Sequence, residues 1–177
     1  MKRLLLTIAI LLLTAAAHTA VAQRIAYGER TPRLNLKNCS WLDDKVPAPG
    51  EFVYIGFVYS RSNACLEFCE RIKRRMARME HPMQVILVTR EPEDMIHKHV
   101  HECLGDNVGT IIDHDGHIFR EFGVRYVPFA VLIDDKRRAI WFGNPLTGDR
   151  DVFTNTPRKE IKKRKNHKSD RWPNSQK

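Results

Sequence analysis

Residues 50–69 read GEFVYIGFVYSRSNACLEFC, an apolar run followed by a short polar break and two cysteines. The run from Phe52 to Tyr59 is rich in β-branched and aromatic side chains, as is typical of a strand buried on both faces of a sheet. Ser60 to Asn63 ends this run and supplies side chains that cap helices. The stretch therefore predicts a central strand that leads through a short loop into a helix.

The residues after the loop have the periodicity of an amphipathic helix of about 16 residues, which His81-Pro82 ends. Its apolar positions recur at spacings of three or four, at Cys65, Cys69, Ile72, Met76 and Met79. Buried cysteines behave as small hydrophobic residues. Because both cysteines lie on the apolar stripe, the pattern leaves open whether they react or only pack.

The rest of the body predicts further strands and one further helix. The segments are a buried strand at Val85–Val88, a helix from Pro92 to Leu104, an apolar segment at Val108–Ile112, and a hairpin of Phe129–Ile133 with Arg138–Phe142. A strand–helix–strand–helix order that closes with a hairpin indicates one α/β domain with a mixed sheet.

The two ends of the chain differ from the body. Residues 1–22 combine a basic start, an apolar run of about 14 residues and Ala20-Val21-Ala22, which predicts a signal peptide cleaved after Ala22. The run is shorter than the roughly 20 residues of a membrane-spanning helix. Residues 151–177 are basic and poor in apolar side chains, so we expect a disordered tail. Residues 23–150 remain as the folded domain.

The formal net charge of +9 belongs to these ends, and the body between them is neutral. An exported protein with a neutral body is not expected to bind nucleic acid, whereas the tail could contact an anionic envelope surface weakly. All four cysteines, Cys39, Cys65, Cys69 and Cys103, follow the cleavage site, and exported proteins can keep disulfides. Four cysteines allow three ways of pairing all of them in disulfides. Cys39 and Cys103 could each form a structural disulfide, act as a resolving thiol or only pack in the interior.

The segments Asp113-His-Asp-Gly116 and Phe122-Gly-Val-Arg-Tyr-Val-Pro128, with Pro32-Arg-Leu-Asn-Leu36 before them, form a spaced pattern. Over Gly28 to Gly143 the chain resembles exported thioredoxin-like proteins of the TlpA and ResA type. The resemblance implies a thioredoxin-like α/β fold with a central mixed sheet flanked by helices. It also implies thiol–disulfide exchange with envelope proteins, no cofactor, and a cis-proline at Val127-Pro128 that helps hold an extended substrate segment.

Two alignments of the family's Trp-Cys-x-x-Cys motif stay open. In the alignment without a gap, Ser62 aligns with the first cysteine of the motif and Cys65 with the second. A hydroxyl cannot replace the attacking thiolate in disulfide exchange. Gly56 then stands where thioredoxins carry a buried carboxylate. With three added loop residues, Cys65 becomes the first cysteine and Cys69 its partner, within reach of a disulfide. The distance in sequence to the strand at Val85 favours the ungapped alignment.

If the chain is an active oxidoreductase, Cys65 attacks the disulfide of the partner protein, because a helix N-terminus lowers the pKa of a thiol. Cys69 then resolves the mixed disulfide. Ser62 and Val127-Pro128 would then bind the partner chain. The main alternative is a non-enzymatic module that keeps the peptide groove and has lost redox chemistry.

A Cys-x-x-x-Cys pair with a distant histidine also resembles the Sco copper chaperones, since thiolates with an imidazole suit copper. The candidate histidines are His114 and His117. His97 and His101 share a helix face and could clasp a metal, although such residues are commonly solvated. We therefore assign no metal ligand from the sequence.

Overall fold

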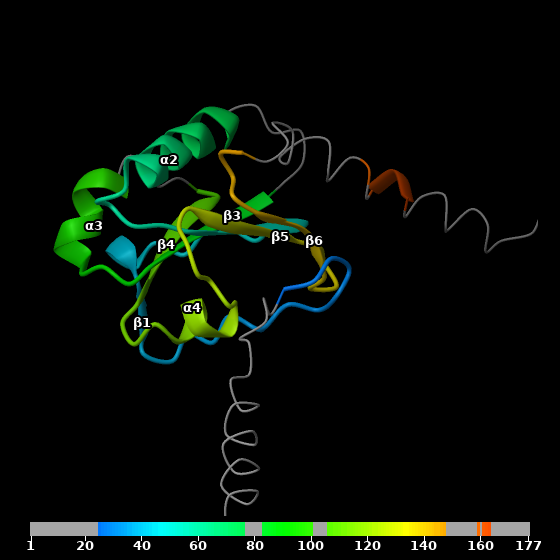
Figure 1. The fold of residues 1–177 in the computed structure, drawn as a ribbon, viewed down its shortest axis with the longest axis horizontal. Helices are drawn as coiled ribbons and strands as arrows, with labels where there is room; N and C mark the ends of the chain where they lie inside the picture. The colour runs from blue at the N-terminus through cyan, green and yellow to red at the C-terminus, as the bar shows by residue number, and fades with distance from the viewer. Residues whose placement is uncertain (1–24, 77–82, 101–105, 148–158, 160, 164–177) are drawn as a thin grey trace, which may run out of the picture.

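The computed structural model describes residues 25–76, 83–100, 106–147, 159 and 161–163. One six-stranded sheet forms the centre, with α2 and α3 on one face and α4 on the other (Figure 1). The strands are β1 (Cys39–Trp41), β2 (Phe52–Phe57), β3 (Met83–Thr89), β4 (Val108–Asp113), β5 (Phe129–Ile133) and β6 (Ala139–Gly143). The helices are the short 3-10 turn η1 (Leu42–Asp44), α2 (Asn63–Met76), α3 (Glu93–Val100) and α4 (His117–Glu121).

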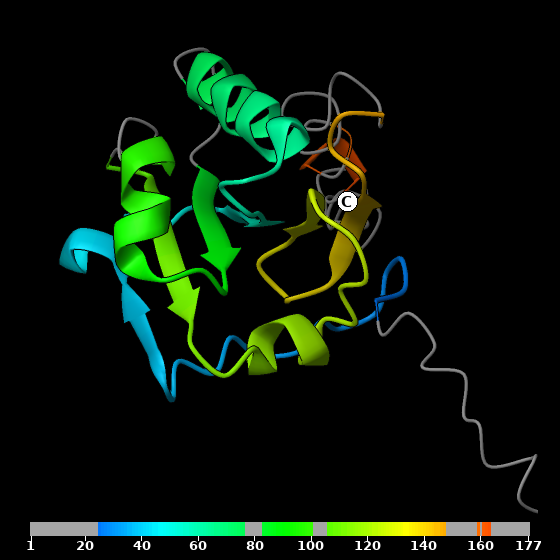
Figure 2. The ribbon, with the colours of Figure 1, turned by 60° about the vertical axis from the view of Figure 1, so that its left-hand side comes forward.

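The strand order is β1-β4-β3-β2-β5-β6. Strands β2, β3 and β4 run parallel, whereas β5 pairs antiparallel with β2, β6 with β5, and β1 with β4. The mixed sheet, the closing hairpin and the central place of β2 confirm the fold class predicted from the sequence. Figure 2 shows the two layers of helices from the side of the sheet.

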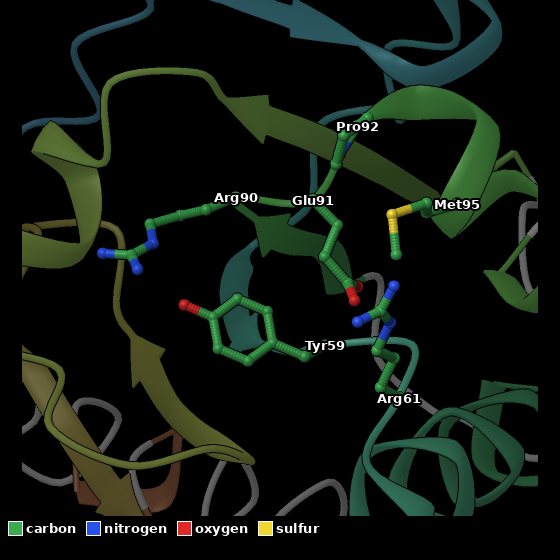
Figure 3. A pocket seen from close by; sticks show the side chains of 6 residues that line it. All are labelled: Tyr59, Arg61, Arg90, Glu91, Pro92 and Met95. Atoms are coloured by element: carbon green, nitrogen blue, oxygen red, sulfur yellow. The ribbon is translucent and has the colours of Figure 1, made fainter.

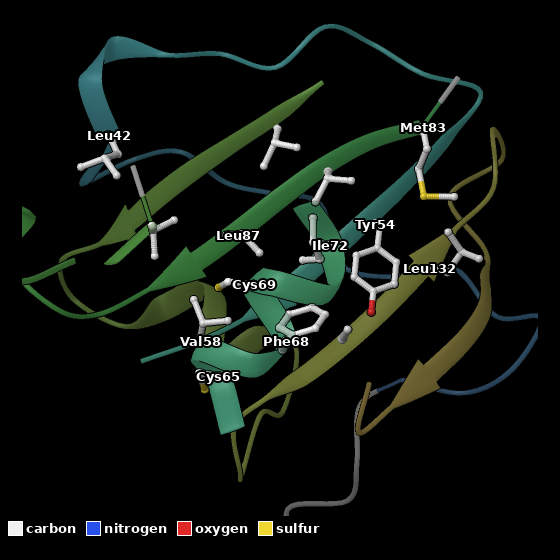
Figure 4. Close-up of a cluster of buried hydrophobic side chains, with 14 of the residues drawn as sticks. Leu42, Tyr54, Val58, Cys65, Phe68, Cys69, Ile72, Met83, Leu87 and Leu132 are labelled. Atoms are coloured by element: carbon white, nitrogen blue, oxygen red, sulfur yellow. The ribbon is translucent and has the colours of Figure 1, made fainter. Parts of the chain in front are cut away.

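Two apolar clusters fill the space between the sheet and its helices. The cluster on the α2 side contains Tyr54, Phe68, Ile72 and Leu132, all buried (Figure 4). The cluster on the opposite side surrounds Phe57 with aromatic rings from α4 and its flanks. Each fully buried side chain of this size contributes about 1.5–3 kcal/mol, so the two clusters hold the sheet between its layers.

Three short elements of the structure have no counterpart among the elements predicted from the sequence. Strand β1 and the turn η1 have three residues each, and α4 has five. Segments this short do not complete the periodicity from which strands and helices are recognised. The helix expected from Pro92 to Leu104 is described as far as Val100, and residues 101–105 lie outside the described part.

The ends of the chain are described only in part. Residues 1–24 lie outside the described residues, so the signal peptide stays a prediction. Within the expected disordered tail, residues 161–163 are helical, and Ile161 packs against the α2-side cluster. For the rest of residues 151–177 the disordered tail stays a prediction. None of the helices among the described residues is long and apolar enough to span a bilayer.

Candidate functional site

The hydrogen bonds at the start of α2 identify the side chain that caps the N-terminus of this helix. The backbone N–H of Leu66 donates to the carbonyl oxygen of Ser62 at 3.0 Å, which makes Ser62 the capping residue. The Ser62 hydroxyl oxygen accepts from the backbone N–H of Cys65 at 3.3 Å. The side chain that caps α2 is therefore a hydroxyl, and both alignments of the cysteines stay predictions.

The two helix cysteines face the interior. Cys65 is 1% exposed and Cys69 is 3% exposed, and both belong to the α2-side cluster (Figure 4). Cys65 is a free thiol. Neither sulfur lies at the surface in this conformation, so attack on a protein disulfide would require the first turns of α2 to move. The redox pairing of these two cysteines stays a prediction.

The ungapped alignment places Gly56 on the thioredoxin carboxylate, and in the structure an aromatic ring fills the space that a side chain would need here. A Cβ at this position would lie 2.8 Å from a ring carbon of Phe68 and 3.1 Å from a methyl group of Leu87. The closeness of the ring explains why glycine is required here. It also leaves no room for a carboxyl group that could move protons beneath the cysteines.

The loop between β2 and α2 is tied to the end of β3. The Glu91 carboxylate accepts hydrogen bonds from the backbone N–H of Ser60 and, at 3.0 Å, from its hydroxyl. The backbone N–H of Val58 donates to the carbonyl oxygen of Val88 at 3.0 Å. These contacts hold Ser62 in one place relative to the sheet.

Pro128 and the start of this loop lie at the same end of the neighbouring strands β2 and β5. The Val127–Pro128 peptide bond is cis, and Pro128 directly precedes β5. In the sheet Phe57, the last residue of β2, pairs with Phe129, so the segments beyond each residue are neighbours. The β2–α2 loop, which leads to Ser62, therefore begins beside Val127 and Pro128.

The segment before the proline offers an exposed aromatic ring. Tyr126 is 52% exposed, and its ring contacts Phe129 edge-on at 5.6 Å between centroids. A hollow of about 200 Å³ lies between this ring, Gly123 and Arg125. Exposed tyrosines that keep one rigid orientation are common anchors in protein recognition.

A larger hollow of about 400 Å³ lies on the other side of the β2–α2 loop (Figure 3). Arg90 places its guanidinium carbon 6.0 Å from the centre of the Tyr59 ring, a cation–π distance. Arg61 and Glu91 point toward one another across the opening (Figure 3). The lining residues are Tyr59, Arg61, Arg90, Glu91, Pro92 and Met95.

Of the predicted histidines, His114 lies in the turn after β4, His117 begins α4 and His97 lies on α3. The His114 ring nitrogen Nε2 is 3.1 Å from the Ser40 hydroxyl, and His97 Nε2 is 3.0 Å from an oxygen of Asp43. His101 and Cys103 lie outside the described residues. Among the described residues, the group of potential metal ligands within 4.8 Å of one another is Cys39, Asp113 and His117.

This group shows strong mutual electrostatic effects. Burial raises the pKa of the Cys39 thiol to about 11, with further contributions from the negative charges of Asp113 and Asp115. The side-chain hydrogen bond to Asp115 and the bond to the Asn35 carbonyl raise the pKa of His117. The same side-chain bond lowers the pKa of Asp115 to about 2. No pattern in the sequence indicates this group, because Cys39 lies 74 residues before Asp113 and comes beside it only when β1 pairs with β4.

Comparison with protein families finds no matching family model, and comparison with characterised protein sequences finds no match. Solved structures do match. A solution structure of a candidate protein disulfide isomerase from Bacteroides thetaiotaomicron has a TM-score of 0.58 and 16% identity, over 82% of this chain and 94% of that one. A thioredoxin-like protein from Aeropyrum pernix has a TM-score of 0.53 and 16% identity, over 66% and 79%.

A third similar structure is a secreted disulfide oxidoreductase of Mycobacterium tuberculosis, homologous to E. coli DsbE. Its TM-score is 0.51 at 16% identity, over 60% of this chain and 80% of that one. At these identities the similarity shows the fold, which is thioredoxin-like as predicted.

Proposed function

We propose that this chain uses its thioredoxin-like fold as an exported binding module for extended protein segments, derived from a thiol–disulfide oxidoreductase but lacking the attacking thiol. The observation that carries the proposal is the hydroxyl of Ser62 at the cap of α2, with Cys65 buried one turn later. A serine hydroxyl does not exchange with a disulfide near neutral pH, because the step requires a sulfur nucleophile.

The groove that remains is suited to an extended chain. Pro128 and the start of the β2–α2 loop lie at the same end of strands β2 and β5, and a segment laid there can pair its backbone with the residues before β5. Glu91 holds the loop, so binding does not have to order it. Tyr126 offers the exposed ring that would contact the side chains of the bound segment.

Export is supported by the signal-peptide pattern that ends at Ala22 and by the secreted oxidoreductase among the similar structures. The partners would then be proteins of the cell envelope that carry thiols or disulfides. We expect the mature chain to begin at Gln23, which intact-mass measurement of protein secreted by its own host would check. A mass that retains residues 1–22 would contradict export with cleavage.

Site-specific photo-crosslinking tests the groove. A photoreactive phenylalanine at Tyr126 should form adducts with envelope proteins, whereas the same residue at Tyr27 should not. Tyr27 is a matched control because it is 70% exposed and lies beside Ala139, at the opposite end of β5 and β6 from Pro128. Equal adduct formation at both positions would contradict a binding groove next to Pro128.

The second candidate function is thiol–disulfide exchange by Cys65 with Cys69 as resolving thiol. It is favoured by the position of the two cysteines one turn apart near the start of α2. It requires the first turns of α2 to open, because both thiols are buried. Insulin reduction by the wild type that disappears in Cys65→Ser would favour this candidate over the binding module.

A Sco-like copper role is the third candidate, and it rests on the Cys-x-x-x-Cys spacing alone. His114 contacts Ser40 of β1, and His117 contacts Asp115 and Asn35 in the segments next to the β1–β4 pair. Titration with Cu(I), followed by native mass spectrometry, tests it. Absence of stoichiometric uptake that depends on Cys65 would remove this candidate.

A further inference from the structure

Cys39 is a half-buried cysteine outside α2. It lies beside the buried carboxylate of Asp113 and the imidazole of His117. We propose that Cys39, Asp113 and His117 form a binding site for a single zinc-like divalent cation, separate from the groove at Pro128. The three ligand atoms lie within 4.8 Å of one another. The site does not depend on the function proposed above.

The distances are close to those of a tetrahedral metal site. The Asp113 oxygen Oδ1 is 3.3 Å from His117 Nδ1 and 3.9 Å from the sulfur of Cys39. With metal–ligand bonds of about 2.0–2.3 Å, tetrahedral geometry separates oxygen from nitrogen by about 3.3 Å and oxygen from sulfur by about 3.6 Å. The oxygen–nitrogen distance thus matches the tetrahedral value, the oxygen–sulfur distance exceeds it by about 0.3 Å, and the Cys39 sulfur lies within 4.8 Å of a ring nitrogen of His117.

The orientation of the imidazole is the second observation. His117 Nε2 lies 2.6 Å from the carbonyl oxygen of Asn35, which can only accept, so Nε2 carries a hydrogen. The other nitrogen, Nδ1, then faces Asp113 at 3.3 Å and Asp115 at 2.6 Å. A histidine that binds a metal commonly donates its second ring N–H to a backbone carbonyl in this way. In the metal-free chain Nδ1 carries a second hydrogen, bonded to Asp115, and a cation bound beside Asp113 would take the place of that hydrogen.

Asp113 is held with one oxygen directed at the same place. Its side chain is fully buried, and its oxygen Oδ2 accepts from the backbone N–H of Phe119 at 3.1 Å. Oδ1 remains for Cys39 and His117. A buried carboxylate is stabilised by an adjacent positive charge, which a cation would provide.

The fold explains how residues so distant in sequence meet. Cys39 is the direct partner of Asp113 in the antiparallel β1–β4 pair. Gly116, with a φ of 69°, ends the turn after β4 in a conformation that favours glycine. His117 then begins α4 four residues after Asp113, on the side of the chain that faces Cys39.

The ligand types select the class of cation. Magnesium and calcium prefer oxygen ligands, whereas one thiolate, one imidazole and one carboxylate suit zinc and its spectroscopic substitute cobalt(II). Binding replaces the thiol proton of Cys39 and the proton on His117 Nδ1 with the cation, and both protons pass to solvent. Three protein ligands leave the fourth position for a water molecule. The bound cation would join the edge strand β1 to the β4–α4 turn.

The test uses the untagged mature chain and Co²⁺ or Zn²⁺ alone. Wild type should take up one Co²⁺ per chain, with a thiolate-to-cobalt charge-transfer band in the near ultraviolet. Cys39→Ser should abolish the band, and His117→Ala should weaken binding at least about tenfold. The matched controls Cys65→Ser and His114→Ala should keep the wild-type spectrum. Absence of stoichiometric uptake, or a band that survives Cys39→Ser, would overturn the proposal.

A second measurement covers the case in which a variant fails to fold. Zn²⁺ should slow alkylation of Cys39 in the wild-type chain, as mapped by peptide mass spectrometry, and a chelator should restore the rate. Alkylation of Cys39 that is unaffected by Zn²⁺ would also overturn the site.

Discussion

At the scale of single residues, the proposed loss of redox chemistry rests on Ser62 and Gly56. Ser62 caps α2 with a hydroxyl oxygen that accepts a backbone N–H bond. At Gly56, the space that a side chain would need is filled by the ring of Phe68. Under the ungapped alignment both residues bear on the same chemistry, because one replaces the nucleophile and the other replaces the nearby proton acceptor.

The packing at Gly56 yields a stability prediction. Gly56→Ala should lower the free energy of unfolding by about 1–3 kcal/mol, because the added methyl group must displace Phe68. Urea denaturation measures the change. In a Phe68→Leu background the same substitution should cost less, since the smaller side chain can move away; equal costs in both backgrounds would contradict a direct clash.

Asp134 gives the pH prediction. Burial tends to raise its pKa, but the backbone N–H and guanidinium of Arg138 and the backbone N–H of Lys136 outweigh that effect and hold the pKa below its usual value. Because the folded pKa is lowered, the contribution to stability is complete above about pH 4, the ordinary value for aspartate, and is lost as pH falls through the folded pKa.

Asp134→Asn should therefore lower the free energy of unfolding at pH 7 by about 1–3 kcal/mol, since it weakens several bonds to a buried group. The difference from wild type should shrink as the solution is acidified below pH 4. Asp135→Asn is the matched control, because that side chain is exposed in the same turn. A difference that stays constant down to pH 2 would contradict the assigned role.

At the scale of elements, the long strands and helices could be predicted from the sequence, whereas the short ones could not. Strand β2 and the β5–β6 hairpin were predictable because their apolar runs are continuous and bounded by turns. Strand β1 was not, because Cys39–Trp41 has neither alternation nor length. Its existence depends on pairing with β4, which lies about 70 residues further along the chain.

The same distinction applies to the candidate sites. The spacing in the β2–α2 segment allows both alignments of the cysteines, and it could not show that the Ser62 hydroxyl caps α2. The resemblance to known proteins led us to expect the β2–α2 loop beside Pro128. The group at Cys39 could not, because it forms only through long-range pairing.

The tie between the β2–α2 loop and β3 also makes a prediction. Glu91→Ala should expose the backbone of residues 60–62 to faster amide hydrogen exchange, because Ser60 loses two hydrogen bonds. The expected loss of stability is about 1–2 kcal/mol. Glu93→Ala, on the exposed first turn of α3, should leave exchange in the loop unchanged. Unaltered exchange in Glu91→Ala would mean that the carboxylate does not fix the loop.

At the scale of the whole molecule, the C-terminal segment contributes to the folded domain through Ile161. Its side chain packs on the α2-side cluster, beyond the end of the sheet. Ile161→Ala should lower the free energy of unfolding by about 1 kcal/mol, given its partial burial. Lys162→Ala, exposed on the next residue, should have no measurable effect in the same denaturation experiment. Equal effects of the two substitutions would contradict docking by Ile161.

The molecule as a whole keeps the layers of a thioredoxin-like fold while its α2 thiols lie inside. Insulin reduction by wild type and Ser62→Cys tests this account most directly, since the substitution restores a cysteine at the helix cap, three residues before Cys65. We predict that the wild type stays at the background rate and that Ser62→Cys reduces insulin. Reduction by the wild type that is lost in Cys65→Ser would contradict the account.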